Sequence, residues 1–350
     1  LVDDDQRNDL VLWNSASGLV EFWMMDGTTR IGAAVPLSGA PTLAHLARVE
    51  TTAIEGMPIG GNEVAFRLFN MPDSVAVYGT QYFLPSRGTI IVMHGLGAND
   101  ALSRQAGDSL RRVTGMNILF LDLRGNGRST GARGRIGHDT QYADDLASVV
   151  RELKRANPSG PVLLVGVRQG AGTVLAFVAH ASDAEQPRVQ GIALVDPILT
   201  LDSLQMAGTQ DGGALQWHIR RWRAQQLLNV VGLHFADRLP VAYQRTQRPD
   251  GPTARTFSWR AIRTLLPRDP WAIANGAPMP LLLVRRETPD AAPLRRTDRH
   301  EVESVPAEAS LFASTTWRIF ERWTAQFSAD AAIRENILPY VPIPLTDTTR

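Results

Sequence analysis

Residues 162–175 read Val-Leu-Leu-Val-Gly-Val-Arg-Gln-Gly-Ala-Gly-Thr-Val-Leu, and this stretch decides the fold. Its first part is an apolar run rich in β-branched residues, which is typical of a buried strand. Its last part is apolar and typical of a helix, and the glycines between them allow strand and helix to pack closely. The turn places Arg168 at its centre. A strand, a sharp turn and a helix in this order indicate an α/β architecture.

The five residues Gly166-Val167-Arg168-Gln169-Gly170 have the spacing of the nucleophile elbow, G-x-S-x-G, in which a serine at the centre attacks a carbonyl carbon. Here the centre is Arg168. A guanidinium stays protonated at any working pH and cannot act as a nucleophile. The stretch therefore predicts a hydrolase-like scaffold from which the usual chemistry is missing.

The composition excludes several classes of protein. With 350 residues, 44% of them hydrophobic, the chain can bury a full-sized core and add a smaller domain. Its formal net charge of +1 creates no overall field that would attract nucleic acid. The absence of cysteine excludes disulfides, thiolate zinc sites and a cysteine nucleophile. No apolar run approaches the ~18 residues of a membrane span, and no feature indicates a compartment or an oligomeric state.

From residue 63 onward, strand-like and helix-like segments alternate. This alternation predicts a doubly wound, mostly parallel sheet with an inserted helical cap and a small β-rich extension at the N-terminus. The predicted parts are, in chain order, the extension 1–36, a linker 37–62, the core 63–199 and 278–328, the cap 200–277 and an irregular tail 329–350. Within the core, strands are expected over 161–166, 191–195 and 280–284, and an amphipathic helix over 311–327.

The N-terminal extension contains three strand-like pieces separated by turns. It resembles one blade of the FG-GAP or VCBS propeller repeats, and Asp3, Asp5 and Asp9 fall where that family places calcium ligands. Gln6 stands where a loop glycine is expected, and an acidic surface loop is the alternative interpretation of these carboxylates. One blade cannot bury its faces alone, so the extension either follows other blades or packs on the core. We interpret the start at Leu1 as a processing boundary.

Residues 63–328 resemble the α/β-hydrolase superfamily, most closely its lysophospholipase or monoacylglycerol-lipase-like branch. The resemblance rests on His94-Gly95-Leu96-Gly97, on Asp122-Leu-Arg-Gly-Asn-Gly-Arg-Ser129 and on the elbow, in that order along the chain. It implies a carboxylester hydrolase with a serine, an acid and a histidine, and no cofactor. Fold alone does not carry function, so the individual positions decide whether this chemistry remains.

The resemblance places the acid at Asp290, which has a second interpretation as a turn or helix-cap residue. It places the histidine near Ser310, so two of the three triad positions are altered. His300 is the nearby substitute base, but it lies at the start of the last strand, and because a parallel connection crosses the sheet we expect it at the far edge, away from the elbow. Rescue by His300 would still leave no nucleophile.

The family's oxyanion hole uses backbone N–H groups, which here belong to Leu96 and Gln169. Backbone donors survive a change of side chain, so a preformed anion hole is predicted. The expected helix after Gln169 points its positive end at the same place. In the pocket loop formed by His94 and Gly95, the histidine either takes part in chemistry or orders the loop.

Three functions remain open on the sequence alone. The first is an inactive or altered relative of the serine ester hydrolases that binds an acyl or anionic small molecule. The second is an active or formerly active ester hydrolase whose elbow serine was replaced, and the third is a propeller-linked interaction module. For Arg168 we predict a bidentate ion pair with Asp290, with binding of a ligand carboxylate or phosphate as the alternative. The stretch Arg220-Arg221-Trp222-Arg223 is either a solvated helix face or a surface for lipid headgroups or nucleic acid.

Overall fold

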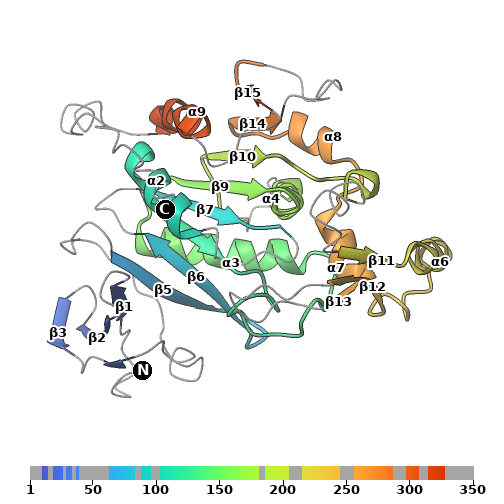
Figure 1. The fold of residues 1–350 in the computed structure, drawn as a ribbon, viewed down its shortest axis with the longest axis horizontal. Helices are drawn as coiled ribbons and strands as arrows, with labels where there is room; N and C mark the ends of the chain where they lie inside the picture. The colour runs from blue at the N-terminus through green and yellow to red at the C-terminus, as the bar shows by residue number, and fades with distance from the viewer. Residues whose placement is uncertain are drawn as a thin grey trace, which may run out of the picture.

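A computed structural model of the chain confirms a large, mostly parallel sheet flanked by helices (Figure 1). The structure describes residues 10–14, 19–26, 29–33, 37–38, 63–82, 88–95, 103–180, 186–204, 215–244, 256–286, 297–306 and 314–327. The strands of the main sheet follow the spatial order β15-β14-β10-β9-β7-β8-β6-β5-β1-β2-β3, and β4 pairs with β2.

The centre of the sheet is made of six parallel strands. They are β7 (Thr89–Met93), β8 (Asn117–Leu121), β9 (Val162–Val167), β10 (Gly191–Val195), β14 (Leu281–Arg286) and β15 (His300–Val305). Two antiparallel strands, β5 (Glu63–Asn70) and β6 (Ala76–Tyr82), join the sheet beside β8. The strands β7, β8, β9, β10 and β14 are mostly buried on both faces because helices cover both sides, which explains their nearly continuous apolar sequences. The edge strand β15 is partly exposed and carries polar residues.

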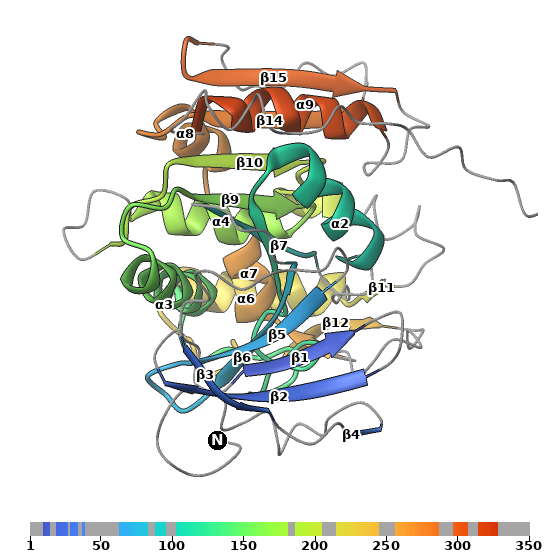
Figure 2. The same ribbon diagram turned by 90° about the vertical axis from the view of Figure 1, so that its left-hand side faces the viewer.

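Alternate residues of each central strand pack on opposite faces of the sheet. Ile91 and Leu164 belong to one core cluster, with α3 (Gln141–Ala156) and α4 (Gly170–Ala179). Ile90 and Leu163 belong to the other, with α2 (Ser103–Thr114) and α9 (Ser314–Thr324), which is followed by η2 (Ala325–Phe327). Figure 2 shows the sheet from the side, with the helices on either face. The predicted doubly wound arrangement is thereby confirmed.

The N-terminal strands extend this sheet. The three predicted pieces form β1 (Leu10–Asn14), β2 (Leu19–Asp26) and β3 (Thr29–Ala33), and Leu37–Ser38 in the expected linker forms β4. β1 pairs antiparallel with β5, so the meander continues the edge of the core sheet. Most of the linker, the tail 329–350 and the carboxylates Asp3, Asp5 and Asp9 lie outside the described residues.

The insertion between β10 and β14 is not made of helices alone. It contains α6 (Ile219–Val230), α7 (Trp259–Leu265) and α8 (Pro270–Asn275), and also a separate antiparallel sheet of β11 (Leu215–Trp217), β12 (Pro240–Gln244) and β13 (Thr256–Ser258). We expected only helices here. Strands of three to five residues give too short an alternation to be recognised beside the prolines of this segment. Among the described helices, none is long and apolar enough to span a membrane.

Candidate functional site

The turn after β9 has the geometry of an elbow, and Arg168 is its apex. Arg168 has a φ of 53°, in the left-handed region that a non-glycine residue rarely adopts. Its backbone N–H donates to the Val195 carbonyl (2.9 Å), and its carbonyl accepts from Ile198 (3.2 Å) and Ala171 (3.2 Å). The turn is thus held on one side by the end of β10 and on the other by the first turn of α4. Such over-determined strain is typical of functional turns.

The glycines on either side of Arg168 are required by close backbone contacts. A Cβ atom on Gly166 would lie 2.5 Å from the Cα of Ala171, and one on Gly170 would lie 2.2 Å from the carbonyl oxygen of Met93. Neither neighbour is a side chain that could move aside. The strand, the turn and α4 therefore pack as tightly as the glycine spacing predicts.

Arg168 itself is partly buried at the carboxyl edge of the sheet. It presents a permanently charged guanidinium that donates hydrogen bonds but has no lone pair for attack on a carbonyl carbon. The apex can therefore hold an anion or pair with a carboxylate. It cannot form a covalent acyl intermediate.

The predicted anion hole is described in part. Gln169 is buried, and a Cβ atom on Gly95 would lie 2.2 Å from its side-chain Oε1, so the elbow and the loop after β7 are in direct contact. Leu96, the second predicted donor, lies outside the described residues. The observed contact brings the backbone of Gly95 to the N-terminus of α4, where the helix dipole favours negative charge.

His94 uses both ring nitrogens to order the backbone. The N–H of Leu123 donates to Nε2 (3.1 Å), and Nδ1 lies 2.7 Å from the Gly95 carbonyl oxygen. Because Nε2 accepts, the proton of the neutral ring must be on Nδ1, from which it is donated to Gly95. His94 therefore ties the loop after β7 to the loop after β8, with both ring nitrogens against the backbone of these loops.

Asp290 and Ser310, the predicted acid and histidine positions, both lie outside the described residues. His300 is described and lies at the start of β15. Strand register puts His300 beside Leu281, which is level with Ile192 and then with Leu164. His300 is therefore separated from Arg168 by about 13 Å along the strand direction, which is the length of four residues of β9. It is also separated by about 14 Å across the sheet, which is three strand spacings. His300 is buried, and among the described residues its ring nitrogens have no hydrogen-bond partner, so the structure does not bring it together with Arg168.

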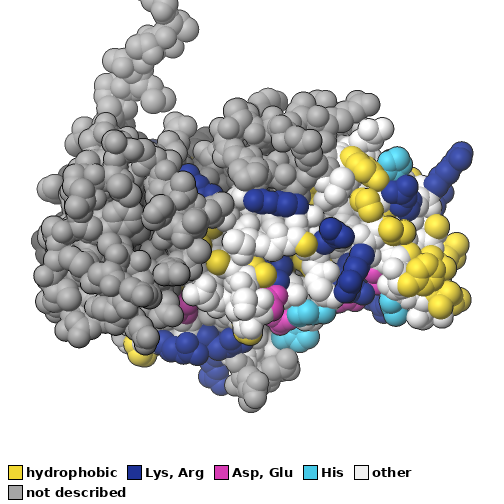
Figure 3. All heavy atoms as spheres, turned by 90° about the horizontal axis from the view of Figure 1, so that it is seen from below, with side chains coloured by type: hydrophobic (Ala, Val, Ile, Leu, Met, Phe, Trp, Pro, Cys, Tyr) yellow, Lys and Arg dark blue, Asp and Glu magenta, His cyan; other side chains and the backbone are white. Residues whose placement is uncertain are grey.

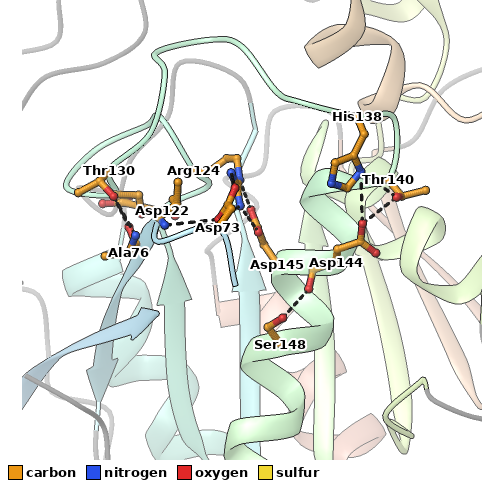
Figure 4. Close-up of polar contacts among 12 residues, drawn as sticks. Asp73, Ala76, Asp122, Arg124, Thr130, His138, Thr140, Asp144, Asp145 and Ser148 are labelled. Atoms are coloured by element: carbon orange, nitrogen blue, oxygen red, sulfur yellow. Dashed lines mark hydrogen bonds and ion pairs between the residues drawn. The ribbon is translucent and has the colours of Figure 1, made fainter. Parts of the chain in front are cut away.

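The loop after β8 is organised by an ion-pair cluster that the sequence analysis did not identify (Figure 4). Arg124 donates from Nε and Nη2 to both carboxylate oxygens of Asp145 (2.6 Å each), and from Nη1 to Asp73 (2.6 Å). Arg124 and Asp145 are buried, whereas the side chain of Asp73 is 47% exposed. The three residues join the β5–β6 turn, the loop after β8 and α3.

Burial and charge act differently on the members of this cluster. The hydrogen bond from Arg124 lowers the pKa of Asp73, which is mostly solvated. Burial raises the pKa of Asp145, and the guanidinium of Arg124 opposes that change. Burial alone would lower the pKa of Arg124, but its bonds to both carboxylates raise it above its ordinary value. The cluster is a structural support of the loop, because its carboxylates are occupied by Arg124.

One polar residue beside the elbow was also missed. Asp196 follows β10 directly, has a φ of 45°, and lies 3.6 Å from Nε of Arg286 at the end of β14. Register aligns Val167 with Val195, so Asp196 is the neighbour of Arg168 across two strand ends. The signal in the sequence is a carboxylate placed immediately after a parallel strand, because such strand ends meet at one edge.

Among the described residues, no group of three histidines, aspartates and glutamates could hold a metal ion. A hollow of about 460 Å³ lies at the opposite edge of the sheet, where α3 ends and β9 and β10 begin. Its lining includes four cations, namely Arg151, Lys154, Arg155 and Arg188. It is separate from the elbow, and the amine of Lys154 in its lining donates to the Gly160 carbonyl (2.8 Å) and to Gln190 (3.1 Å).

Comparison with known proteins places these observations in a family. The family model described as "Serine aminopeptidase, S33" matches residues 85–281, which is more than half of the chain. No curated protein matches this chain. A soluble variant of monoglyceride lipase from Saccharomyces cerevisiae, solved with a substrate analog, is similar in structure with a TM-score of 0.56 and 14% identity, over 75% of this chain and 96% of that one. The α/β hydrolase GrgF from Penicillium sp. sh18 has a TM-score of 0.51 and 16% identity, over 76% and 99%. These likenesses confirm the predicted fold.

Proposed function

Since the chain belongs to the serine aminopeptidase S33 family and has the α/β-hydrolase fold, we propose that it is a relative of the serine ester hydrolases that has lost acyl-transfer chemistry. The single observation that carries this proposal is the guanidinium of Arg168 at the apex of the elbow, at a φ of 53°. Nucleophilic acyl transfer needs an oxygen or sulfur at this point, and the chain has no cysteine to supply the latter.

The positions of the other triad members support the same conclusion. The resemblance assigns the histidine to Ser310, and a serine cannot act as the general base. His300 cannot replace it from the far end of β15. His94 is held by Gly95 and Leu123. With base and nucleophile both altered, what remains of the hydrolase machinery is the backbone anion hole at Gln169 and Leu96.

We propose further that Arg168 forms a bidentate ion pair with Asp290 and so fills the former catalytic pocket. An unpaired guanidinium at a partly buried turn would cost several kcal/mol. Arginine's planar fork matches a carboxylate, and the missing histidine leaves room between the two positions. In the competing picture, Arg168 binds the carboxylate or phosphate of an acyl or anionic small molecule beside Leu96 and Gln169. The complex of the yeast lipase with a substrate analog supports binding of a small molecule on this fold.

Activity of the full chain tests the main proposal. Without a nucleophile and a general base the acyl-enzyme step is unavailable, so hydrolysis of para-nitrophenyl butyrate should equal that of a heat-denatured sample. A fluorophosphonate probe, which labels activated serines, should leave the chain unmodified. Stoichiometric labelling, or a burst of nitrophenol equal to the protein concentration, would show an active ester hydrolase with a nucleophile elsewhere.

The interaction-module alternative has a separate test. Residues 1–36 would need calcium for a propeller-type loop at Asp3, Asp5 and Asp9. A calcium titration of the full chain, followed by its melting temperature, should show no change if these residues form an acidic surface loop. A saturable rise in melting temperature would favour the module.

A further inference from the structure

The outer end of the insertion carries an unusual surface. In the part of the chain that the structure describes, all of the exposed large hydrophobic side chains fall within residues 227–239. They are Leu227, Val230, Val231, Leu233, Phe235 and Leu239, with exposed fractions from 46% to 79%. Figure 3 shows hydrophobic side chains gathered at one end of the molecule, next to Lys and Arg side chains. We name this surface, α6 and the turn 231–239 after it, the α6 surface. Contiguous exposed apolar groups mark interaction sites in soluble proteins.

The helix periodicity explains how the surface is formed. Trp222 and Gln225 point into the insertion and are buried. The opposite side carries Arg220, Arg223, Leu227 and Val230, spaced by three, four and three residues, which places them on one stripe of the helix. The stripe is cationic in its first half and aliphatic in its second. The methylene groups of an arginine can pack on neighbouring aliphatic side chains while its guanidinium stays in water.

The apolar turn is built into the fold. Gly232, at a φ of 78°, ends α6, and Leu233 donates its N–H to the Leu228 carbonyl (2.8 Å), which is the hydrogen-bond pattern of a helix C-cap. Beneath the turn, buried Asp237 accepts from Asn229 (2.5 Å) and from Arg260 of α7 (3.1 Å). The hydrogen bonds of Asp237 therefore fix the backbone of the turn that carries the exposed apolar side chains.

The α6 surface is positively charged. Between residues 216 and 243 the sequence has four arginines and a single carboxylate, Asp237, which is 1% exposed and already engaged. Arg221 is also engaged, by the carbonyl of Pro240 and the hydroxyl of Tyr243. Arg220, Arg223 and Arg238 are exposed and make no ion pair within the described residues. The surface thus offers cations and apolar groups together.

We propose that the α6 surface docks on an anionic lipid–water interface. Interfacial helices combine arginines with an exposed apolar face, and membrane affinity grows with the buried apolar area and with the attraction to anionic headgroups. A second copy of the chain is the poorer occupant, because a two-fold contact would bring the same arginines of both copies together. The inference does not depend on whether the elbow is active, because none of these residues belongs to it.

Co-sedimentation of the full chain with vesicles tests the proposal. The chain should bind vesicles of equimolar phosphatidylglycerol and phosphatidylcholine, bind pure phosphatidylcholine more weakly, and lose affinity as salt increases. Leu227→Gln with Phe235→Ser should lower the partition coefficient at least about tenfold, because two apolar anchors are lost. Arg220→Gln with Arg223→Gln should lower it by roughly fivefold per arginine on the anionic vesicles alone.

Matched controls separate this surface from general charge and from folding. Arg151→Gln with Arg155→Gln removes two exposed arginines from α3 and should leave binding unchanged. Leu227→Met with Phe235→Leu keeps the apolar character and should bind like the parent. All replaced side chains are exposed, so melting temperatures should agree. Equal binding by parent and polar variants, or absence of binding to anionic vesicles, would overturn the proposal. So would a concentration-dependent dimer that the Leu227 and Phe235 variants abolish without any vesicle binding.

Discussion

Gly172 in α4 lies directly against the backbone of Leu265 in α7: a Cβ atom on the glycine would be 1.9 Å from the leucine's carbonyl oxygen. The helix that begins at the elbow is therefore clamped between Met93, which contacts Gly170, and the insertion, which contacts Gly172. The turn that carries Arg168 is fixed by contacts from both sides. Its position does not depend on the identity of the apex side chain.

Substitution of Gly172 by alanine should accordingly destabilise the fold, by about 3 kcal/mol, because backbone atoms of α4 and α7 must separate. Gly276→Ala is the matched control. Gly276 has a negative φ, and its nearest neighbour, the carbonyl of Ala272, would be 3.2 Å from a new Cβ, so a change within about 1 kcal/mol is expected. Urea unfolding followed by tryptophan fluorescence measures both. Equal stability of the two variants would mean that α4 and α7 are not in close contact.

The Arg124 cluster predicts unequal effects of its two carboxylates. Asp145→Asn should lower the free energy of unfolding by about 3 kcal/mol, because the buried guanidinium loses a bidentate partner. Asp73→Asn should cost about 1 kcal/mol or less, because Asp73 is half exposed. Asp144→Asn, one residue away on the exposed side of α3, is the control and should cost about 1 kcal/mol or less, because its contacts with Thr140 and His138 are exposed. A ranking in which Asp73→Asn is the most damaging would contradict the assignment of Asp145 as the principal partner.

Acid should remove the contribution of Asp73. Its pKa is lowered from the ordinary value of 3.8 by the hydrogen bond from Arg124. A carboxyl whose folded pKa is depressed stabilises the fold above its unfolded pKa, and this stabilisation disappears as the pH falls through the folded pKa. The melting temperatures of the parent and of Asp73→Asn should therefore differ near neutral pH and converge as the pH falls below the ordinary carboxyl value of 3.8 and through the lower folded pKa. A constant difference across this range would show that Asp73 acts through shape and not through charge.

Much of the architecture could be predicted because the periodicity of apolar residues and the spacing of glycines are local signals in the sequence. The elbow at Gly166–Gly170 and the last strand at His300–Val305 illustrate this. The strands of the insertion could not be predicted, because β11 and β13 have three residues each and depend on pairing with β12. A strand of that length is defined by its partner and not by its own sequence.

The cluster of Asp73, Arg124 and Asp145 illustrates a second limit. These residues come from three segments that are far apart along the chain, and each alone has the sequence signature of a surface charge. The burial of Arg124 and Asp145 follows from the contact between the loop after β8 and α3, and no local pattern encodes that contact. The same holds for the α6 surface, where the sequence shows arginines and aliphatic residues but not which of them the insertion leaves exposed.

Restoration of catalysis tests how much of the hydrolase remains. Arg168→Ser with Ser310→His should recover measurable esterase activity, because the elbow geometry and the contact between Gly95 and Gln169 are in place. Arg168→Ser alone should recover less, because its hydroxyl lacks a base. Arg151→Ser is the control for loss of an arginine and should stay inactive. Equal activity of the single and double variants would show that the histidine position is wrong, and loss of that activity on His300→Ala would then assign the base to His300.

The role of Arg168 is decided by a thermal-shift experiment on Asp290. If the two residues form an internal ion pair, Asp290→Ala should strongly lower the melting temperature, because breaking a buried pair leaves a charge without compensation. Added fatty acid or phosphate should then change the parent's melting temperature little. If Arg168 instead binds a ligand, Asp290→Ala should have a mild effect and either anion should stabilise the parent in a concentration-dependent way. Asp298→Ala, at an exposed position before β15, controls for loss of a carboxylate in this region. An unchanged melting temperature in Asp290→Ala would overturn the ion pair, because a partly buried arginine at the strained apex would then be stable without it.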